Sequence, residues 1–427
     1  MYRPISSSVT KFKELPRAEE IQPDREIRRG PRVASKEVPP DLRSVPGSPR
    51  EPKQEHWFAR HFPEPNFKLG ILTQTYYTVL DNIPAPTHET HKILKEKYGD
   101  LIKRVNQEAD LYHEKPPASP PDPSPDLTKE IKAKAKEAGV DLVGITRFDR
   151  TYVTAETKGQ ALFKHVIVLC RAFDWNITHT IPSVEWDVHS YDTSLALSLA
   201  GLELADFIRS KGYRVQFIAG TGTPGEQMIA PILPYAIAAG LGQMGANGTM
   251  LTPEFGSRVR VIGISTDATV THDKPVDYGI NILCEKCQVC VQRCPGRALP
   301  NIKVNWHGVT KYRIITERCQ PMLKYAECNI CTKVCPVQHF GLKRVLDHYR
   351  ETDGQILGKG TDELESYTMF DKGRFGVGDR PKFNVKEGGK GLMQMAVSLK
   401  LIQPIRPVLE RNPDPLYDED RIPALEE

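Results

Sequence analysis

The spacing of apolar residues predicts alternating helices and strands in the middle of the chain. Residues 127–138 set Ile131, Ala133 and Ala135 among charged side chains, a pattern typical of an amphipathic helix that ends at Gly139. Four short runs rich in apolar and β-branched residues indicate strands, at residues 140–146, 165–170, 213–219 and 259–265. We therefore expect an α+β fold in which helices pack on a sheet.

Two further segments have the composition of buried helices. Residues 194–211 are apolar on nearly every side and end at Gly212, which indicates a helix enclosed by other elements. Residues 228–239 are similar, and they lead into a glycine-rich turn at residues 240–248. Both helices are expected to belong to the core that contains the four strands.

Proline divides the chain unevenly, since 19 of the 35 prolines precede Leu127. Such a density prevents long helices and strands. Large apolar side chains such as Trp57 and Phe58 nevertheless indicate an arm that packs on the core, joined to it by a stiff linker. We expect four parts: the arm and linker (1–125), an α/β domain (126–277), a cysteine-rich domain (278–345) and a C-terminal covering region (346–427).

Charge and hydropathy exclude several classes of protein. The 427 residues include 58 basic and 54 acidic side chains, a balance that does not require a nucleic-acid partner. No apolar run is long enough to span a bilayer. Arg28-Arg29 lacks the apolar stretch that follows in a twin-arginine signal. We expect a cytoplasmic protein, or an exported one associated with the membrane through a partner protein if a leader has been removed.

Eight of the nine cysteines lie within residues 284–335 and form two arrays. The first is Cys284-x2-Cys287-x2-Cys290-x3-Cys294-Pro295, and the second is Cys319-x8-Cys328-x2-Cys331-x3-Cys335-Pro336. In ferredoxins with two clusters, the fourth cysteine of such an array binds the other [4Fe–4S] cluster. The arrays therefore predict one cluster on Cys284, Cys287, Cys290 and Cys335, and a second on Cys319, Cys328, Cys331 and Cys294.

Structural zinc and disulfides are the simpler alternatives for these cysteines. Zinc ligands usually come as two close pairs, and disulfides do not call for two arrays of this spacing. The ninth cysteine, Cys170, lies in an apolar run and is best explained as a small buried side chain.

Two clusters form an electron path, and the segment before them is long enough to hold the acceptor. The glycine-rich turn does not match the G-x-G-x-x-G fingerprint of dinucleotide sites, because it follows a helix and leads into a loop. These glycines are better explained by a backbone that must approach a large planar cofactor closely. The candidate contacts are Gly240, Gly242, Gly245, Asn247, Gly248 and Tyr235.

Several short segments follow one another in a distinctive order. They are Tyr191-Asp192-Thr193-Ser194, Ile229-Ala230-Pro231, AAGLGQ at residues 238–243, LTPEFG at residues 251–256, Arg258 and Thr266-Asp267. Both cysteine arrays follow these segments. In this order of segments and arrays, residues 127–341 resemble the corrinoid- and iron–sulfur-dependent reductive dehalogenases. The resemblance implies a nitroreductase-like α/β domain holding a base-off cobamide (cobalamin or a related corrinoid), followed by a ferredoxin-like domain with two [4Fe–4S] clusters.

The resemblance also implies a reaction. Electrons pass through the clusters to the cobamide, whose Co(I) state cleaves a carbon–halogen bond and releases halide. Tyr191 stands where the family's proton-donating tyrosine falls. Relatives commonly place Arg or Lys where this chain has Ala246, so Arg258 or Arg260 is the candidate for the supporting cation. The expected partners are a small organohalide, a reduced ferredoxin or flavodoxin-type electron donor and a second copy of the chain.

Other aromatic and histidine residues have two interpretations each. Trp57, Trp175, Trp186 and Tyr235 are candidates to line a pocket, although aromatic residues pack in cores more often. His189 is more consistent with a structural role than with cobalt ligation, and His307 with shielding a cluster.

Two other functions share the same cysteine arrays. An epoxyqueuosine reductase would use an aspartate near Tyr191, and Asp192 is adjacent, but the helical repeats expected after the clusters in that family are absent. An electron-transfer subunit would need no substrate site of its own. Cobalt binding and halide release distinguish the three hypotheses.

Overall fold

The structure is a computed structural model of the chain. It describes residues 96, 99–101, 104–105, 107–109, 111–121, 126–149, 161–219, 229–299, 301, 304–306, 309–312, 314, 319, 328–369 and 373–379. Most of the proline-rich arm, with Trp57, and also His307 lie outside these residues.

Four antiparallel strands form the central sheet, in the order β1–β2–β6–β3. Their bounds are Leu142–Arg147 for β1, His165–Ala172 for β2, Val259–Thr266 for β6 and Val215–Ala219 for β3. β2 and β6 pair over eight residues, from His165 opposite Thr266 to Ala172 opposite Val259. All four predicted strands are present, with ends that differ by one or two residues.

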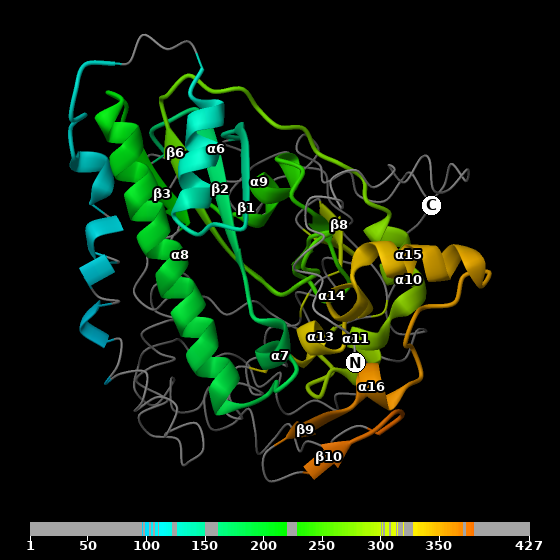
Figure 1. Cartoon of the computed structure of the whole chain (residues 1–427). Coiled ribbons are helices and arrows are strands. Elements are labelled where there is room, and N and C mark those ends of the chain that lie inside the picture. Colours follow the sequence, from blue (N-terminus) through cyan, green and yellow to red (C-terminus); the bar gives the residue numbers. More distant parts are fainter. Residues whose placement is uncertain are drawn as a thin grey trace.

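Helices cover both faces of this sheet. α6 (Thr128–Glu137) and α8 (Val184–Ser210) lie on one face, and α9 (Leu233–Ala238) packs on the other, against β1 and β2 (Figure 1). Alternate residues of β2 serve the two layers: Ile167 and Leu169 contact the α8 side, whereas Val166 and Val168 contact the α9 side. This is the two-residue periodicity of a strand buried on both faces. A short 3-10 helix, η3 (Tyr112–Glu114), packs beside β3.

The long helix α8 begins at Val184 rather than at the predicted residue 194. Ser183 caps it, because its hydroxyl accepts a hydrogen bond from the backbone N–H of Trp186 at 3.0 Å. The first turns contain Glu185, Asp187 and Asp192, so their apolar periodicity is too weak to reveal a helix. α9 is also shorter than predicted, with Pro234 in its first turn.

The cysteine-rich part is built from short helices on the side of the sheet away from α8 (Figure 1). They are α10 (Ile280–Cys287), α11 (Val289–Arg293), α13 (Ile330–Lys333), α14 (Pro336–Phe340) and α15 (Leu342–Glu351). Leu283, Ile330, Val337 and Leu342 share one apolar core with Phe173 and Trp186 from the sheet region. The smaller elements are α7 (Trp175–Thr178), β4 (Gln243–Met244), β5 (Met250–Leu251), β7 (Val304–Trp306) and β8 (Val309–Lys311).

The region after α15 contains more regular structure than its sequence predicts. It forms α16 (Asp362–Glu365) and a hairpin of β9 (Tyr367–Met369) and β10 (Gly373–Phe375). Buried Arg293 ties this region to α11, donating hydrogen bonds to the carbonyl oxygens of Glu365, Phe375 and Asp379. Three backbone acceptors satisfy one buried guanidinium, which stabilises this attachment. In the described part of the chain, none of the helices could cross a membrane.

Two leucines of α8 test how this helix is held. Leu197 is 0% exposed in the core against the sheet, whereas Leu199 is 45% exposed. We expect Leu197→Ala to lower the free energy of unfolding by about 2–5 kcal/mol, because it leaves a cavity in a packed core. Leu199→Ala, the matched control, should change it by no more than about 0.5 kcal/mol. Chemical denaturation followed by circular dichroism measures both, and equal effects would contradict the described packing.

Candidate functional site

Four cysteines from both arrays surround one cavity. α10 carries Cys284 and Cys287, α11 carries Cys290, and Cys335 directly precedes α14. All four line a cavity whose other walls are largely apolar and include Ala246, Asn247, Leu251 and Val337. Burial, and then the nearby thiols of Cys287, Cys284 and Cys335, raise the pKa of Cys290. The fourth cysteine of this set therefore comes from the second array.

The remaining four cysteines form a second set. Burial, and then the charge of Cys294, raise the pKa of Cys319 to about 12. Burial and the same neighbours, Cys319 and Cys294, also raise the pKa of Cys328 and of Cys331. Cys294 thus lies with the cysteines of the second array. It accepts a hydrogen bond from the backbone N–H of Ala298 at 3.3 Å.

The two sets of cysteines are not arranged around single points. Among the described residues, no three His, Cys, Asp or Glu side chains converge closely enough to hold one metal ion. In a [4Fe–4S] cluster, by contrast, four thiolates bind four different iron atoms. Gln288 adopts a left-handed backbone conformation (φ 53°) between α10 and α11, and its amide donates hydrogen bonds to the Cys284 carbonyl and the Tyr312 hydroxyl.

A short segment between β5 and β6 connects the first set of cysteines to the sheet. Thr252 and Gly256 pair through their backbones, which closes the turn. Gly256 has φ +57°, and a Cβ there would approach the backbone nitrogen of Gln338 in α14 to 2.5 Å. Burial raises the pKa of the Cys335 thiol, whereas the backbone N–H groups of Gln338 and Val337, and then the buried hydroxyl of Ser257 that faces it, act in the opposite direction. This segment therefore contacts the cysteine set directly.

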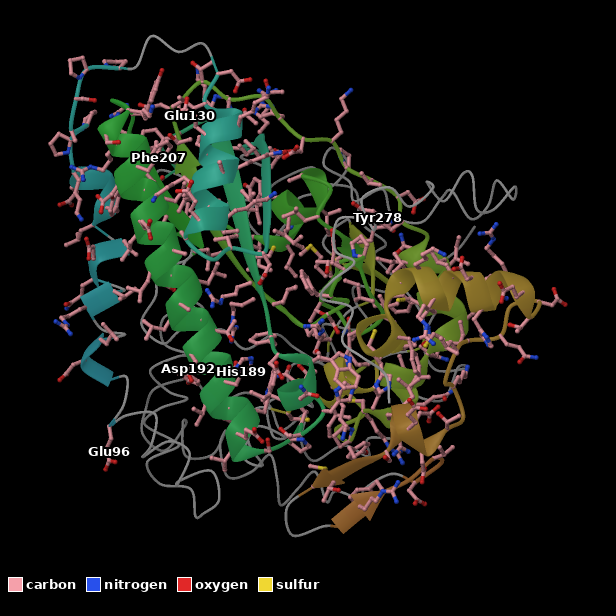
Figure 2. The ribbon with its side chains drawn as sticks, in the orientation of Figure 1. Glu96, Glu130, His189, Asp192, Phe207 and Tyr278 are labelled. Atoms are coloured by element: carbon pink, nitrogen blue, oxygen red, sulfur yellow. The ribbon has the colours of Figure 1, made fainter. Side chains whose placement is uncertain are left out.

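A second cavity, of about 630 Å³, lies on the other side of this segment. One wall is a single face of α8, formed by His189, Asp192, Thr193 and Ala196. These positions are spaced i, i+3, i+4 and i+7, the spacing that places residues on one side of a helix. Figure 2 shows His189 and Asp192 on this part of α8. The rest of the wall comes from Gly139, Asp141, Arg171, Ala172, Phe173, Asp174, Trp175, Phe255 and Arg258.

His189 is held by the chain itself. Its Nε2 accepts a hydrogen bond from the backbone N–H of Asp174 at 2.8 Å, so in the neutral ring the proton is on Nδ1. Burial lowers the pKa of His189, and the nearby carboxylates of Asp174 and Asp192 oppose this effect. Since Nε2 is already used, the geometry favours the structural role that the sequence predicts for this histidine.

Arg258 places a buried positive charge at the cavity. Its Nη1 donates to the carbonyl oxygen of Phe173 at 2.5 Å, and its guanidinium lies 5.1 Å from the centre of the Phe255 ring. Its buried Nε has no hydrogen-bond partner among the described residues. Burial lowers the pKa of Arg258 to about 10, partly offset by Asp174 and Asp141. Arg260 instead donates to the Ser190 hydroxyl at 2.9 Å.

Tyr191 does not line this cavity. It is 8% exposed and packs in the core with Leu195, one turn further along α8. A helix rotates by about 100° per residue, so neighbours in sequence point in different directions. The structure therefore brings Asp192 to the cavity and turns Tyr191 toward the core.

The predicted cofactor contacts lie elsewhere in the structure. The turn around Gly240, Gly242, Gly245 and Gly248 packs on the protein's own chain: a Cβ on Gly242, for example, would lie 2.2 Å from the Leu251 carbonyl oxygen. Tyr235 lies in the core beneath the sheet, and its hydroxyl donates to the Asp149 carbonyl. Ala246, where a cation was expected, is buried beside the first cysteine set. Trp186 is a core residue, whereas Trp175 lines the cavity.

A pair of histidines, which the sequence did not indicate, joins the cavity wall to α14; His339 is buried and His179 is half-buried. His179 Nδ1 lies 2.6 Å from the Trp175 carbonyl oxygen, and its Nε2 lies 2.7 Å from His339 Nδ1. The Trp175 indole N–H donates in turn to the His339 carbonyl at 3.2 Å. Since a carbonyl oxygen only accepts, His179 carries its proton on Nδ1, and His339 donates from Nδ1. Residues separated by 160 positions carry no periodic signal of such a contact.

Comparison with known proteins identifies relatives of the chain. No protein-family model matches it. Over 315 residues it is 26% identical to a tetrachloroethene reductive dehalogenase of Sulfurospirillum multivorans, covering 61% of each chain. Over 110 residues, 24% of this chain, it is 34% identical to an epoxyqueuosine reductase of Lactococcus garvieae, 30% of whose length is aligned. The chain thus spans about three fifths of the length of the first relative.

Solved structures show the same fold. A reductive dehalogenase whose structure suggested a mechanism for B12-dependent dehalogenation superposes with a TM-score of 0.52 at 20% identity, covering 65% of this chain and 43% of that one. The catabolic reductive dehalogenase NpRdhA, in complex with 3-bromo-4-hydroxybenzoic acid, gives a TM-score of 0.50 at 19% identity with the same coverage. The predicted resemblance to reductive dehalogenases is confirmed, as is the mixed helix-and-strand class.

The histidine pair predicts a loss of stability in acid. Burial lowers the pKa of both His179 and His339 to about 4, with further lowering of the His179 pKa by His339, Lys333 and Arg258. The unfolded chain binds these protons below a pH of about 6.5, whereas the folded chain does not. The free energy of unfolding should therefore fall as the pH drops from about 6.5 toward 4.

His179→Asn should reduce this dependence, because one titrating group is removed. His348→Asn, on α15 outside the pair, is the matched control and should leave the dependence intact. Thermal unfolding of the three proteins at pH 7, 6 and 5 provides the measurement. The same slope in all three would show that the histidine pair does not account for the loss.

Proposed function

We propose that this chain, a relative of the reductive dehalogenases, is a corrinoid-dependent reductive dehalogenase with two [4Fe–4S] clusters. The observation that carries the proposal is that each set of four cysteines includes one cysteine from the other array. The segment from Thr252 to Arg258 connects the first of these sets to the cavity on α8. This arrangement suits transfer of electrons from clusters to an acceptor. Replacing halogen by hydrogen consumes two electrons and one proton and releases halide.

The cysteine sets support the cluster assignment. Cys284, Cys287, Cys290 and Cys335 would hold one cluster, and Cys294, Cys319, Cys328 and Cys331 the other. Thiols in surroundings that raise their pKa are difficult to deprotonate without a bound cation, and iron supplies that charge. In this proposal residues 278–345 are the ferredoxin-like domain, residues 126–277 the nitroreductase-like domain, and residues 346–427 cover them.

The cavity on α8 supports a site for the corrinoid and the substrate. Its volume of about 630 Å³ is in the range of pockets for drug-sized ligands, so it would hold the substrate and only part of the larger corrinoid. Trp175, Phe173 and Phe255 supply flat apolar walls, and Arg258 a buried cation. When bound, a reduced cobamide supplies the electron-rich metal that breaks a carbon–halogen bond. The protein orients the substrate against these walls and limits access of water.

The proton has two candidate sources on α8. Tyr191 is the residue that the family resemblance implies, and Asp192 is the residue that faces the cavity. Asp192 lies on the same face as His189, whose deprotonated Nε2 is engaged with Asp174. We propose that this turn of α8 delivers the proton, with Arg258 as the nearby cation that stabilises the anion left behind.

The position of Asp192 also favours a second candidate function. An epoxyqueuosine reductase would use an aspartate here, and two relatives of the chain have that name. Balanced charge argues against a tRNA substrate, and so does the described region after the clusters, which contains one short helix and a hairpin after α15. We retain the dehalogenase as the proposal. Its electron donor would be a reduced ferredoxin or flavodoxin, and its location the cytoplasm.

Anaerobic reconstitution tests the function. Purified chain given iron, sulfide and cobalamin should retain about eight irons and one cobalt, as expected for one corrinoid and two clusters with four cysteine ligands each. With a strong reductant it should then release halide from members of a panel of aryl and alkenyl halides. Retention of eight irons without cobalt would favour an electron-transfer subunit, and cobalt retention with turnover of epoxyqueuosine-modified RNA alone would favour the second candidate.

Exchange of cysteines between the arrays is tested in the same preparation. Cys294→Ala should disturb the cluster of Cys319, Cys328 and Cys331, although Cys294 belongs to the first array. Cys335→Ala should disturb the other cluster. Electron paramagnetic resonance of the reduced variants distinguishes the two clusters, and loss in the opposite order would refute the exchange.

Two neighbouring substitutions identify the proton donor. Tyr191→Phe removes the phenol hydroxyl and Asp192→Asn removes the ionisable carboxyl group, each with little change in shape. If Asp192 donates, Asp192→Asn should lower halide release by about 10²–10⁴-fold, the usual contribution of a positioned acid, with Tyr191→Phe much less affected. Iron and cobalt content should stay unchanged in both. A large loss confined to Tyr191→Phe would assign the role to Tyr191.

A further inference from the structure

Asn247 lies beside the first cysteine set rather than beside the cavity on α8. It follows β4 in the turn that leads to β5, and its side chain is 2% exposed. It lines the same cavity as Cys284, Cys287, Cys290 and Cys335. An amide side chain is therefore buried within a largely apolar wall around four thiols, where Gln288 is the other polar side chain.

The orientation of this amide follows from its neighbours. Asn247 Oδ1 accepts hydrogen bonds from the backbone N–H of Thr249 at 3.2 Å and from the Thr249 hydroxyl at 3.0 Å. A backbone N–H can only donate, so the oxygen of the amide must be on this side. The nitrogen, Nδ2, necessarily points the other way.

The turn around Asn247 is rigid. Gly245 accepts a hydrogen bond from Gly248 and donates one to Thr249, at 3.0 and 2.8 Å. A Cβ on Gly245 would lie 2.8 Å from Asn247 Oδ1, so glycine leaves the space that the amide occupies. The side chain is thus held in one place from both sides.

Asn247 Nδ2 is buried and has no hydrogen-bond partner among the described residues. Leaving such a donor unsatisfied destabilises the folded protein, a cost that an apolar side chain of similar size would avoid. The four thiols around the same cavity indicate what its partner is. A cluster bound to them presents sulfur atoms, which accept N–H···S hydrogen bonds.

We propose that Asn247 Nδ2 donates a hydrogen bond to a sulfur of the cluster bound by Cys284, Cys287, Cys290 and Cys335, and thereby raises the reduction potential of that cluster. The inference rests on the cluster assignment of the proposed function. Reduction adds negative charge to the cluster, and a hydrogen-bond donor stabilises the more negative state. Asn247 thus makes this cluster easier to reduce than an apolar residue would.

Potentials measured in reconstituted full-length protein without corrinoid test this role. Asn247→Leu removes the donor, and we expect the reduction equilibrium of one cluster to become about tenfold less favourable, a shift of about 59 mV for one electron. The other cluster should keep its midpoint. Asn247→Asp keeps the shape and the acceptor for Thr249 while replacing the donor with an oxygen, and it should lower the same midpoint.

Two matched controls separate this effect from general disturbance. Thr249→Val removes one bond to Oδ1 but keeps the backbone N–H that orients the amide, and it should leave both midpoints in place. Asn281→Leu removes another buried amide, 3% exposed on α10 and outside the cavity wall, and should also leave them in place. Redox titration followed by electron paramagnetic resonance measures all five proteins.

The outcomes are distinct. Unchanged midpoints in Asn247→Leu and Asn247→Asp would overturn the inference, as would equal shifts in the Asn281 control. Failure of both Asn247 variants to bind eight irons would also overturn it, because a bond that only tunes the potential is not needed for assembly. If the unaltered chain assembles no clusters, the proposed function fails instead.

Discussion

The gathering of eight thiols into two adjacent sets constrains how the helices of the cysteine-rich part can pack. A thiol in apolar surroundings has a raised pKa, as the structure gives for Cys287, Cys290 and Cys328. Each set also takes one cysteine from the other array, so α10 and α11 must pack against α13 and α14. The apolar core shared by these helices supplies that packing, and it extends to Phe173 and Trp186 beside the cavity.

The segment from Thr252 to Arg258 connects the first set of cysteines to the cavity on α8. Gly256 lies on the backbone of α14, Ser257 faces Cys335, and Arg258 reaches the carbonyl of Phe173 in the cavity wall. The histidine pair forms a second connection, from Trp175 to His339. The distance between cysteines and cavity is thus held by covalent chain and hydrogen bonds together. Electron transfer in the proposed enzyme would depend on that distance.

α8 serves both the fold and the proposed chemistry because its faces differ. The apolar face, with Leu197 and Tyr191, packs in the core against the sheet, and the polar face with His189 and Asp192 lines the cavity. Asn247 is a similar case on a smaller scale, since its oxygen is engaged by Thr249 and its buried nitrogen has no partner among the described residues. In both places, the contacts made by one side of the helix or of the amide determine which groups the other side presents.

Periodicity and spacing along the chain were enough to predict the four strands, the helices at residues 127–138 and 194–211, and the grouping of the eight cysteines. They did not reveal the first turns of α8, where His189 and Asp192 line the cavity, Glu185 is exposed and Asp187 is buried, so that no apolar periodicity appears. The packing of distant elements determines that Asp192 rather than Tyr191 faces the cavity, that Asn247 lies beside the thiols, and that His179 meets His339. The direction of a side chain depends on what covers the neighbouring face, and that contact comes from residues far away in the sequence.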